Sequence, residues 1–170
     1  MNNKIEILDS TLREGEQTPG VSFTRSQKIE IAKMLDDFGV DFIELGHPAV
    51  SEDIYSTIKL LNSESLASEK IVHARLKKSD IDDAVNLGIP WIGLFFGTSE
   101  DYLYDKYNLD EKNAIEMIKE SVGYAKRNGL KIRFTAEDAS RTDIDFLIKI
   151  GNIAEKAGAD RFSIADTVGI

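Results

Sequence analysis

Residues 9–17 read Asp-Ser-Thr-Leu-Arg-Glu-Gly-Glu-Gln and bring carboxylates, a guanidinium, hydroxyls and an amide into one short segment. The segment follows an apolar stretch, residues 5–8, which predicts a strand that ends in a polar loop. Carboxylates beside an arginine suit a hard divalent metal ion and an anionic oxygen substrate. Salt-bridged surface turns have the same composition, so the choice between a site and a turn depends on the rest of the chain.

The composition limits the class of protein. The 170 residues are 42% hydrophobic and 30% charged, which is typical of a globular protein and predicts a single domain over residues 1–170. The net charge of −9 argues against a nucleic-acid or anionic-membrane surface. The absence of cysteine excludes disulfides, thiolate metal sites and a cysteine nucleophile. The chain has no apolar run near the roughly 20 residues that span a bilayer and no signal-like start, so we expect a cytoplasmic protein.

Four times along the chain, an amphipathic helix is followed by a glycine and then by an apolar strand. Glycine readily takes the left-handed conformation that ends a helix, and the glycines in question are Gly39, Gly88, Gly129 and Gly158. Six strands are expected, with five helices between them, near residues 4–9, 41–46, 69–75, 90–96, 131–136 and 161–165. Strictly alternating strands and helices predict a parallel sheet.

The first helix and one connecting segment carry additional signals. Thr24 and Gln27 predict a capping box at the start of the first helix. Apolar residues at helical spacing predict a face of this helix that packs in the core, made of Ile31, Met34, Leu35 and Phe38. Residues 100–108 contain three tyrosines and join the fourth strand to its helix; they form either a packed connector, a subunit contact or a lid.

Two features favour a barrel over a doubly wound sheet. No glycine-rich phosphate loop follows the first strand, which weakens a dinucleotide-binding interpretation. Polar side chains instead follow nearly every strand, as at the mouth of a barrel: residues 9–17, Glu44 and His47, His73 and Arg75, Thr98 and Ser99, Arg133 to Glu137, and Asp166 and Thr167. A complete (β/α)8 TIM barrel needs eight strands and about 250 residues. We therefore predict an α/β fold, a TIM barrel truncated after about the sixth strand.

Five segments resemble the DRE-type TIM barrels, which catalyse metal-dependent Claisen condensations and include the homocitrate, isopropylmalate and citramalate synthases. The segments occur in the family order and spacing and are Leu8–Gly20, Ile43–Ser51, Phe96–Ser99, Arg133–Arg141 and Ala165–Gly169. The resemblance implies acetyl-CoA as co-substrate, a small keto acid as acceptor, and a divalent metal such as Mg, Mn, Zn or Co.

The resemblance also implies roles for individual residues. Glu14 looks like a metal ligand, and Arg13 looks like the catalytic cation that polarises the keto oxygen and stabilises the alkoxide. The resemblance further implies that Glu137 is a second catalytic residue and that Asp9 orients Arg13. The residues implied in substrate binding are Arg13, Gln17, Glu44, His73, Arg133, Thr135 and Thr167.

Arg133 distinguishes between members of the family. A guanidinium suits the second carboxylate of 2-oxoglutarate, whereas a relative that uses an uncharged keto acid has no use for it. This position and Phe96–Ser99 favour the homocitrate synthase type, which begins lysine biosynthesis by the aminoadipate route. An isopropylmalate or citramalate synthase is the alternative.

Several of these residues have plainer interpretations. Glu44 could pair with a cation on a neighbouring strand, and His73 could be a satisfied core histidine. His47, next to Pro48, is more typical of a structural residue than of a ligand. Asp166 could equally cap a turn.

The family's remaining metal ligands are a His-x-His pair on the seventh strand, whereas the two histidines of this chain are His47 and His73. One carboxylate does not hold a catalytic divalent ion tightly. We therefore expect the isolated chain to lack the family reaction, and a catalytically silent partial-barrel module is the competing hypothesis. Free edges on the first and sixth strands predict a homo-oligomer.

Overall fold

The computed structural model describes residues 4–169, in which six parallel strands form one sheet. The strands are β1 (Leu8–Asp9), β2 (Phe42–Glu44), β3 (Glu69–Arg75), β4 (Trp91–Gly97), β5 (Lys131–Glu137) and β6 (Arg161–Ile164). Their order in the sheet is their order in the chain, and each pairs in parallel with the next. The sheet thus grows by one strand–helix unit at a time, as a TIM barrel does.

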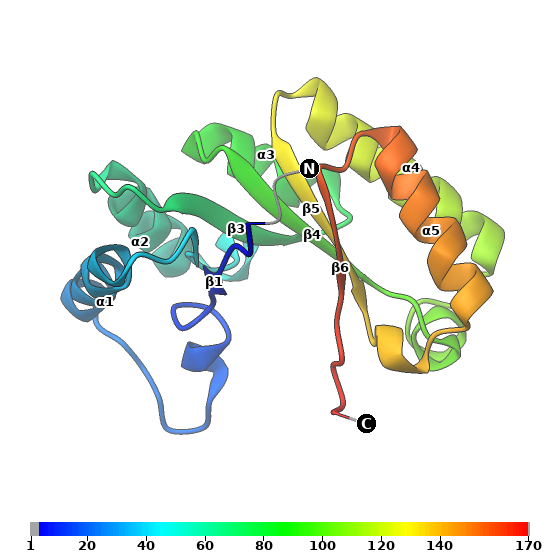
Figure 1. The fold of residues 1–170 in the computed structure, drawn as a ribbon, viewed down its shortest axis with the longest axis horizontal. Coiled ribbons are helices and arrows are strands. Elements are labelled where there is room, and N and C mark those ends of the chain that lie inside the picture. The colour runs from blue at the N-terminus through cyan, green and yellow to red at the C-terminus, as the bar shows by residue number, and fades with distance from the viewer. Residues whose placement is uncertain (1–3, 170) are drawn as a thin grey trace.

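Helices connect the strands and lie on the outer side of the curved sheet, while β1 and β6 face each other across its open side (Figure 1). The long helices are α1 (Arg25–Phe38), α2 (Glu52–Ser63), α3 (Lys78–Leu87), α4 (Glu111–Arg127) and α5 (Ile144–Ala157). Short helices follow the carboxyl ends of four strands: η1 (Gly15–Gln17), η2 (Pro48–Val50), η3 (Asp101–Lys106) and η4 (Ala139–Arg141). Over residues 4–169 no helix combines the length and apolar character that a membrane span requires.

The predicted helix boundaries are confirmed for α1. The Gln27 N–H donates to Thr24 Oγ1 over 3.3 Å, and the Thr24 N–H donates to Gln27 Oε1 over 2.9 Å, which completes the capping box. Gly39 ends the helix in the left-handed conformation, with φ of 91°. Strand β1 is shorter than expected, because only Leu8 and Asp9 pair with β2.

The main core lies between the sheet and the helices. Helices α2 to α5 each contribute a fully buried isoleucine to it: Ile58, Ile81, Ile118 and Ile150. A second, smaller cluster fills the amino-terminal end of the sheet, where Phe42 meets Trp91 edge to face at 5.2 Å. The Arg161 guanidinium covers both rings and also contacts Glu6, so it links β6 to the segment before β1.

The apolar face predicted for α1 is wrong at two positions. Met34 is 65% exposed and Phe38 is 82% exposed. On the other side of the open edge, Ile148 of α5 and Ile164 of β6 are also largely exposed. Helices α1 and α5 are the outermost helices of the array, so the faces that a further strand–helix unit would cover in a closed barrel remain accessible.

Candidate active site

A cavity of about 490 Å³ opens at the carboxyl ends of the strands. Seven predicted site residues line it: Arg13, Glu14, Gln17, His73, Thr135, Glu137 and Thr167. They come from the loop after β1, from β3 and β5, and from the segment after β6. The parallel sheet therefore brings together residues that are up to 154 positions apart in the sequence (13 to 167). The other two predicted residues, Glu44 and Arg133, lie beside the cavity but do not line it.

Glu44 is the centre of a buried ionic cluster and is fully inaccessible to solvent. Its Oε2 accepts a hydrogen bond from Arg13 Nε over 2.6 Å, and its Oε1 accepts one from Arg133 Nη2 over 2.7 Å. His73 Nδ1 lies 3.4 Å from the same Oε1. These contacts match the plainer interpretation of Glu44, pairing with cations on other elements, and its predicted contact with substrate has no support in this geometry.

Arg133 reaches Glu44 because of a glycine between them. The sheet register places His73, Gly93 and Arg133 side by side on β3, β4 and β5. A Cβ atom on Gly93 would lie 3.0 Å from Arg133 Nη2, so the missing side chain leaves the path of the guanidinium free. Arg133 therefore crosses β4 and β3 to meet β2. Its role as the receptor for a distal carboxylate stays a prediction.

The charges in this cluster fix its protonation. Burial alone would raise the pKa of Glu44, but the contact with His73 and the charges of Arg133 and Arg13 outweigh burial and lower the pKa to about 2. Burial also lowers the pKa of His73, and the nearby Glu44 offsets this only in part. The His73 ring stacks on Phe95 with centroids 4.2 Å apart. At neutral pH the cluster thus holds two guanidiniums, one carboxylate and a neutral imidazole.

The loop after β1 is held by backbone and side-chain contacts. The N–H groups of Arg13 and Glu14 both donate to the Ser10 carbonyl oxygen, over 3.0 and 2.8 Å. Lys28 Nζ of α1 pairs with Glu16 at 2.6 Å and ties the loop to the helix. The expectation that Asp9 orients Arg13 is wrong, since Asp9 Oδ1 accepts from the Thr11 N–H and Arg13 is held instead by contacts with Glu44 and Glu14.

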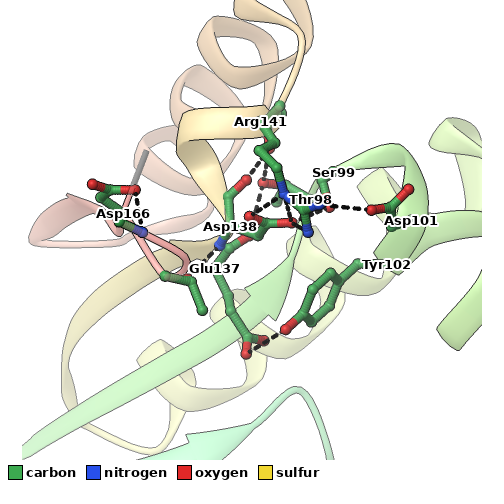
Figure 2. Close-up of polar contacts among 11 residues, drawn as sticks. Thr98, Ser99, Asp101, Tyr102, Glu137, Asp138, Arg141 and Asp166 are labelled. Carbon is green, nitrogen blue, oxygen red and sulfur yellow. Dashed lines mark hydrogen bonds and ion pairs between the residues drawn. The ribbon is translucent and has the colours of Figure 1, made fainter.

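The opposite wall of the cavity carries polar atoms that lack partners. Among the described residues, Thr135 Oγ1 and Glu137 Oε2 are buried and have no hydrogen-bond partner. The other carboxylate oxygen of Glu137, Oε1, accepts a hydrogen bond from the Tyr102 hydroxyl over 3.3 Å (Figure 2). Buried polar atoms without partners are costly, so Thr135 and Glu137 keep hydrogen-bonding capacity that the described residues do not use.

Asp138 ties the ends of three strands together behind this wall (Figure 2). It is fully buried and has a left-handed backbone, with φ of 58°. Its carboxylate accepts hydrogen bonds from Ser99 Oγ over 2.6 Å and from Arg141 Nε over 2.9 Å. Its backbone N–H donates to Thr167 Oγ1 over 2.8 Å, which fixes a hydroxyl of the cavity lining.

Two residues for which the sequence offered structural roles, His47 and Asp166, also line the cavity. His47 lines the cavity, and its Nε2 lies 3.2 Å from Oδ2 of the buried Asp80, which also accepts from Arg75 Nε over 2.7 Å. Asp166 lines the cavity too and caps a turn, since the Gly169 N–H donates to its Oδ1 over 3.1 Å. The position of both residues directly after a strand was the available signal.

The described residues do not form a metal site by themselves. Within residues 4–169, no three His, Cys, Asp or Glu side chains gather where they could hold a metal ion. Glu14 and Gln17 line the same cavity and offer a carboxylate and an amide oxygen, which suit a hard divalent ion in kind. They do not supply the number of ligands that a tight site needs.

Comparison with known proteins shows the family to which this chain belongs. Residues 4–170 match the family model described as HMGL-like. The chain belongs to the HMGL-like family. It is 55% identical to homocitrate synthase from Sulfurisphaera tokodaii and 53% identical to homocitrate synthase from Saccharolobus solfataricus. Each match covers 98% of this chain and 37% of the relative, so the chain spans about a third of the length of these relatives.

Solved structures confirm the predicted fold class. The chain is similar to hydroxymethylglutaryl-CoA lyase from Pseudomonas aeruginosa, with a TM-score of 0.80 and 17% identity over 98% of this chain and 59% of that one. It is also similar to deoxyribose phosphate aldolase from Aeropyrum pernix, with a TM-score of 0.60 and 14% identity over 92% of this chain and 60% of that one. Identities this low establish the fold alone, and the six strands of this HMGL-like chain form a half-barrel of the TIM type.

Replacement of Glu44 tests the ionic cluster. Glu44→Gln should lower the free energy of unfolding by about 3 to 5 kcal/mol, because Arg13 and Arg133 would lose their common carboxylate inside the protein. Urea-induced unfolding at pH 7 measures this loss. The control is Glu116→Gln, at an exposed pair with Lys119, which should change stability by less than about 0.5 kcal/mol.

The stability effect of Glu44→Gln should depend on pH. A carboxyl whose pKa is lowered on folding, here from 4.5 to about 2, stabilises the protein above pH 4.5, and this contribution disappears as the pH falls toward 2. The stability difference between the wild type and Glu44→Gln should therefore be constant near neutral pH and shrink below about pH 4.5. A difference that stays constant down to pH 2.5 would contradict the assignment.

Proposed function

We propose that this chain is part of a homocitrate synthase, which condenses acetyl-CoA with 2-oxoglutarate in lysine biosynthesis by the aminoadipate route. The observation that carries the proposal is the convergence of Arg13, Thr135, Glu137 and Thr167 on one cavity, in a chain 55% identical to homocitrate synthase. In this reaction the acetyl methyl group loses a proton and forms a carbon–carbon bond with the keto carbon. The keto oxygen becomes negatively charged, and hydrolysis then releases CoA.

The arrangement of the lining supports this chemistry. Arg13, held by Glu44, presents a fixed positive charge at the cavity wall, where it would polarise the keto oxygen and stabilise the alkoxide. The hydroxyls of Thr135 and Thr167 would donate to the keto acid. Glu137 has one carboxyl oxygen without a hydrogen-bond partner among the described residues, so this oxygen can take up or release a proton.

Glu14 would supply one ligand to a divalent metal ion, which when bound would polarise the keto acid. Because residues 4–169 do not complete a ligand set, we propose that this chain alone does not catalyse the condensation. This chain alone would then be a partial barrel that contributes one part of the active site. The same absence favours the silent-module alternative, so activity has to be measured in a longer protein.

The activity test compares this chain with a longer protein that continues past residue 170 to the length of the relatives. We expect release of CoA thiol from acetyl-CoA, 2-oxoglutarate and a divalent metal only in the longer protein, because the further ligands that a tight metal site needs would have to come from it. The chain contains no cysteine, so a thiol reagent gives no background from it.

The choice of keto acid in this assay separates the alternatives. A preference for 2-oxoglutarate over 2-oxoisovalerate and pyruvate supports the homocitrate synthase type, and Arg13→Gln should then lower kcat at least about 100-fold. A preference for 2-oxoisovalerate would indicate an isopropylmalate synthase, and one for pyruvate a citramalate synthase. No thiol release with any of the three would support the silent module.

We also propose that this chain associates with further copies of itself through its open edges. β1 and β6 are opposite edges of one parallel sheet, so β6 of one copy could pair with β1 of the next as β5 pairs with β6. Such a head-to-tail contact can repeat, and we expect growth beyond a dimer.

Sedimentation of the chain over a range of concentrations tests this proposal. The average mass should rise with concentration in the wild type and fall toward that of a monomer in Ile164→Lys and in Phe38→Lys, because a charge then occupies each apolar edge. Leu60→Lys, at an exposed position on α2 away from the edges, is the matched control and should behave as the wild type. A monomeric wild type at all concentrations would overturn the proposal.

A further inference from the structure

Glu137 is constrained at one carboxylate oxygen and free at the other. It lies at the end of β5 and lines the cavity. Its Oε1 accepts the hydrogen bond from the Tyr102 hydroxyl, whereas its Oε2 is buried and has no partner among the described residues. The direction of Oε2 therefore depends on the contact that Tyr102 makes with Oε1.

The ring of Tyr102 lies against the end of β4, where glycine is required. A Cβ atom on Gly97 would lie 1.9 Å from Cδ1 of the Tyr102 ring, so no other residue type could be placed there without moving the tyrosine. Lys106, on the same short helix η3, places its Nζ 4.2 Å from the centroid of the Tyr102 ring, a distance typical of a cation–π contact. Gly97 thus lets the phenol cross the end of β4 and reach β5.

The helix that carries Tyr102 is firmly attached to the barrel. Leu103 of η3 is buried in the main core, and Tyr107 stacks on Phe96 of β4 with centroids 4.7 Å apart. Asp101 Oδ2 accepts from Arg141 Nη1 over 2.8 Å, which connects η3 to the Asp138 network (Figure 2). Of the alternatives for residues 100–108, the structure shows a packed connector.

The backbone of Glu137 is fixed independently of Tyr102. The Thr98 N–H donates to the Glu137 carbonyl oxygen over 3.0 Å, and the next residue, Asp138, is held by Ser99 and Arg141. The main chain at the end of β5 is therefore set by β4 and η4. What remains to be set is the side-chain rotation of Glu137, and Tyr102 donates a hydrogen bond to this side chain.

We propose that Tyr102 is a positioning residue that holds one oxygen of Glu137 and thereby fixes the orientation of this carboxylate at the cavity wall. The inference rests on the proposed function, in which Glu137 acts on the reacting groups. A tyrosine suits the task because its stiff ring has only two rotatable bonds and loses little entropy when fixed. Burial, together with the charge of Glu137 and the hydrogen bond to it, raises the pKa of the Tyr102 phenol, as this contact requires.

A titration of the isolated chain tests the contact without any enzyme activity. NMR of ring-labelled tyrosine follows each phenol from pH 8 to 12, and Tyr102→Phe assigns the signal. Glu137→Gln should lower the pKa of Tyr102, because the negative charge that opposes phenol ionisation is removed. The exposed Tyr104 of the same helix should not change and serves as the internal control. An unchanged Tyr102 titration would overturn the proposal.

Kinetics of the longer protein test the consequence. Tyr102→Phe keeps the ring and loses only the hydroxyl, so it should lower kcat about tenfold, the value of one hydrogen bond to a charged group, and change the KM for 2-oxoglutarate less than about twofold. Tyr104→Phe should have no effect. In a Glu137→Gln background, Tyr102→Phe should cause no further loss, because the two residues act as one unit.

The outcomes separate the two proposals. The same tenfold loss in both backgrounds, or a loss seen only in KM, would show that Tyr102 acts otherwise than through Glu137 and would overturn the inference. If the longer protein forms no homocitrate, the proposed function fails. The titration of Tyr102 then decides by itself whether this residue holds Glu137.

Discussion

The buried carboxylate of Glu44 is the interaction on which the candidate site depends. A carboxylate away from water needs charged partners, and Glu44 has two, Arg13 at 2.6 Å and Arg133 at 2.7 Å. The same ion therefore fixes a guanidinium on the loop after β1 and another on β5. The contact with Glu44, together with that with Glu14, holds Arg13 at the cavity wall. The orientation of the residue with the clearest chemical role thus depends in part on Glu44, a group that does not itself reach the cavity.

The parallel sheet determines which groups can take part. Each strand delivers its last residues to the same edge, and short helices or tight turns then fix the loops that follow. On one side Glu44 and Lys28 hold the loop after β1. On the other side Asp138 and Tyr102 hold the ends of β5 and β6. The loop after β1 and the ends of β5 and β6 lie on opposite sides of one cavity. The chain therefore carries a preorganised part of a site even though its barrel is open.

Much of this arrangement could be predicted from the sequence, because it follows from local patterns. Glycines after amphipathic helices located the strands, and polar residues after each strand located the cavity. Contacts between distant elements could not be predicted. The pairing of Glu44 with two arginines needs the sheet register and the gap at Gly93. The exposure of Phe38 depends on what lies beside α1, which helical periodicity does not report.

Binding of 2-oxoglutarate to this chain tests the central claim most directly, because it asks whether the Glu44 cluster alone organises a receptor for the keto acid. NMR titration without metal should show saturable shifts at the cavity residues, with an affinity on the order of millimolar. Arg13→Gln and Glu44→Gln should both abolish these shifts, and Glu116→Gln should leave them unchanged. Equal binding by the wild type and Glu44→Gln, or no binding by the wild type, would contradict the account.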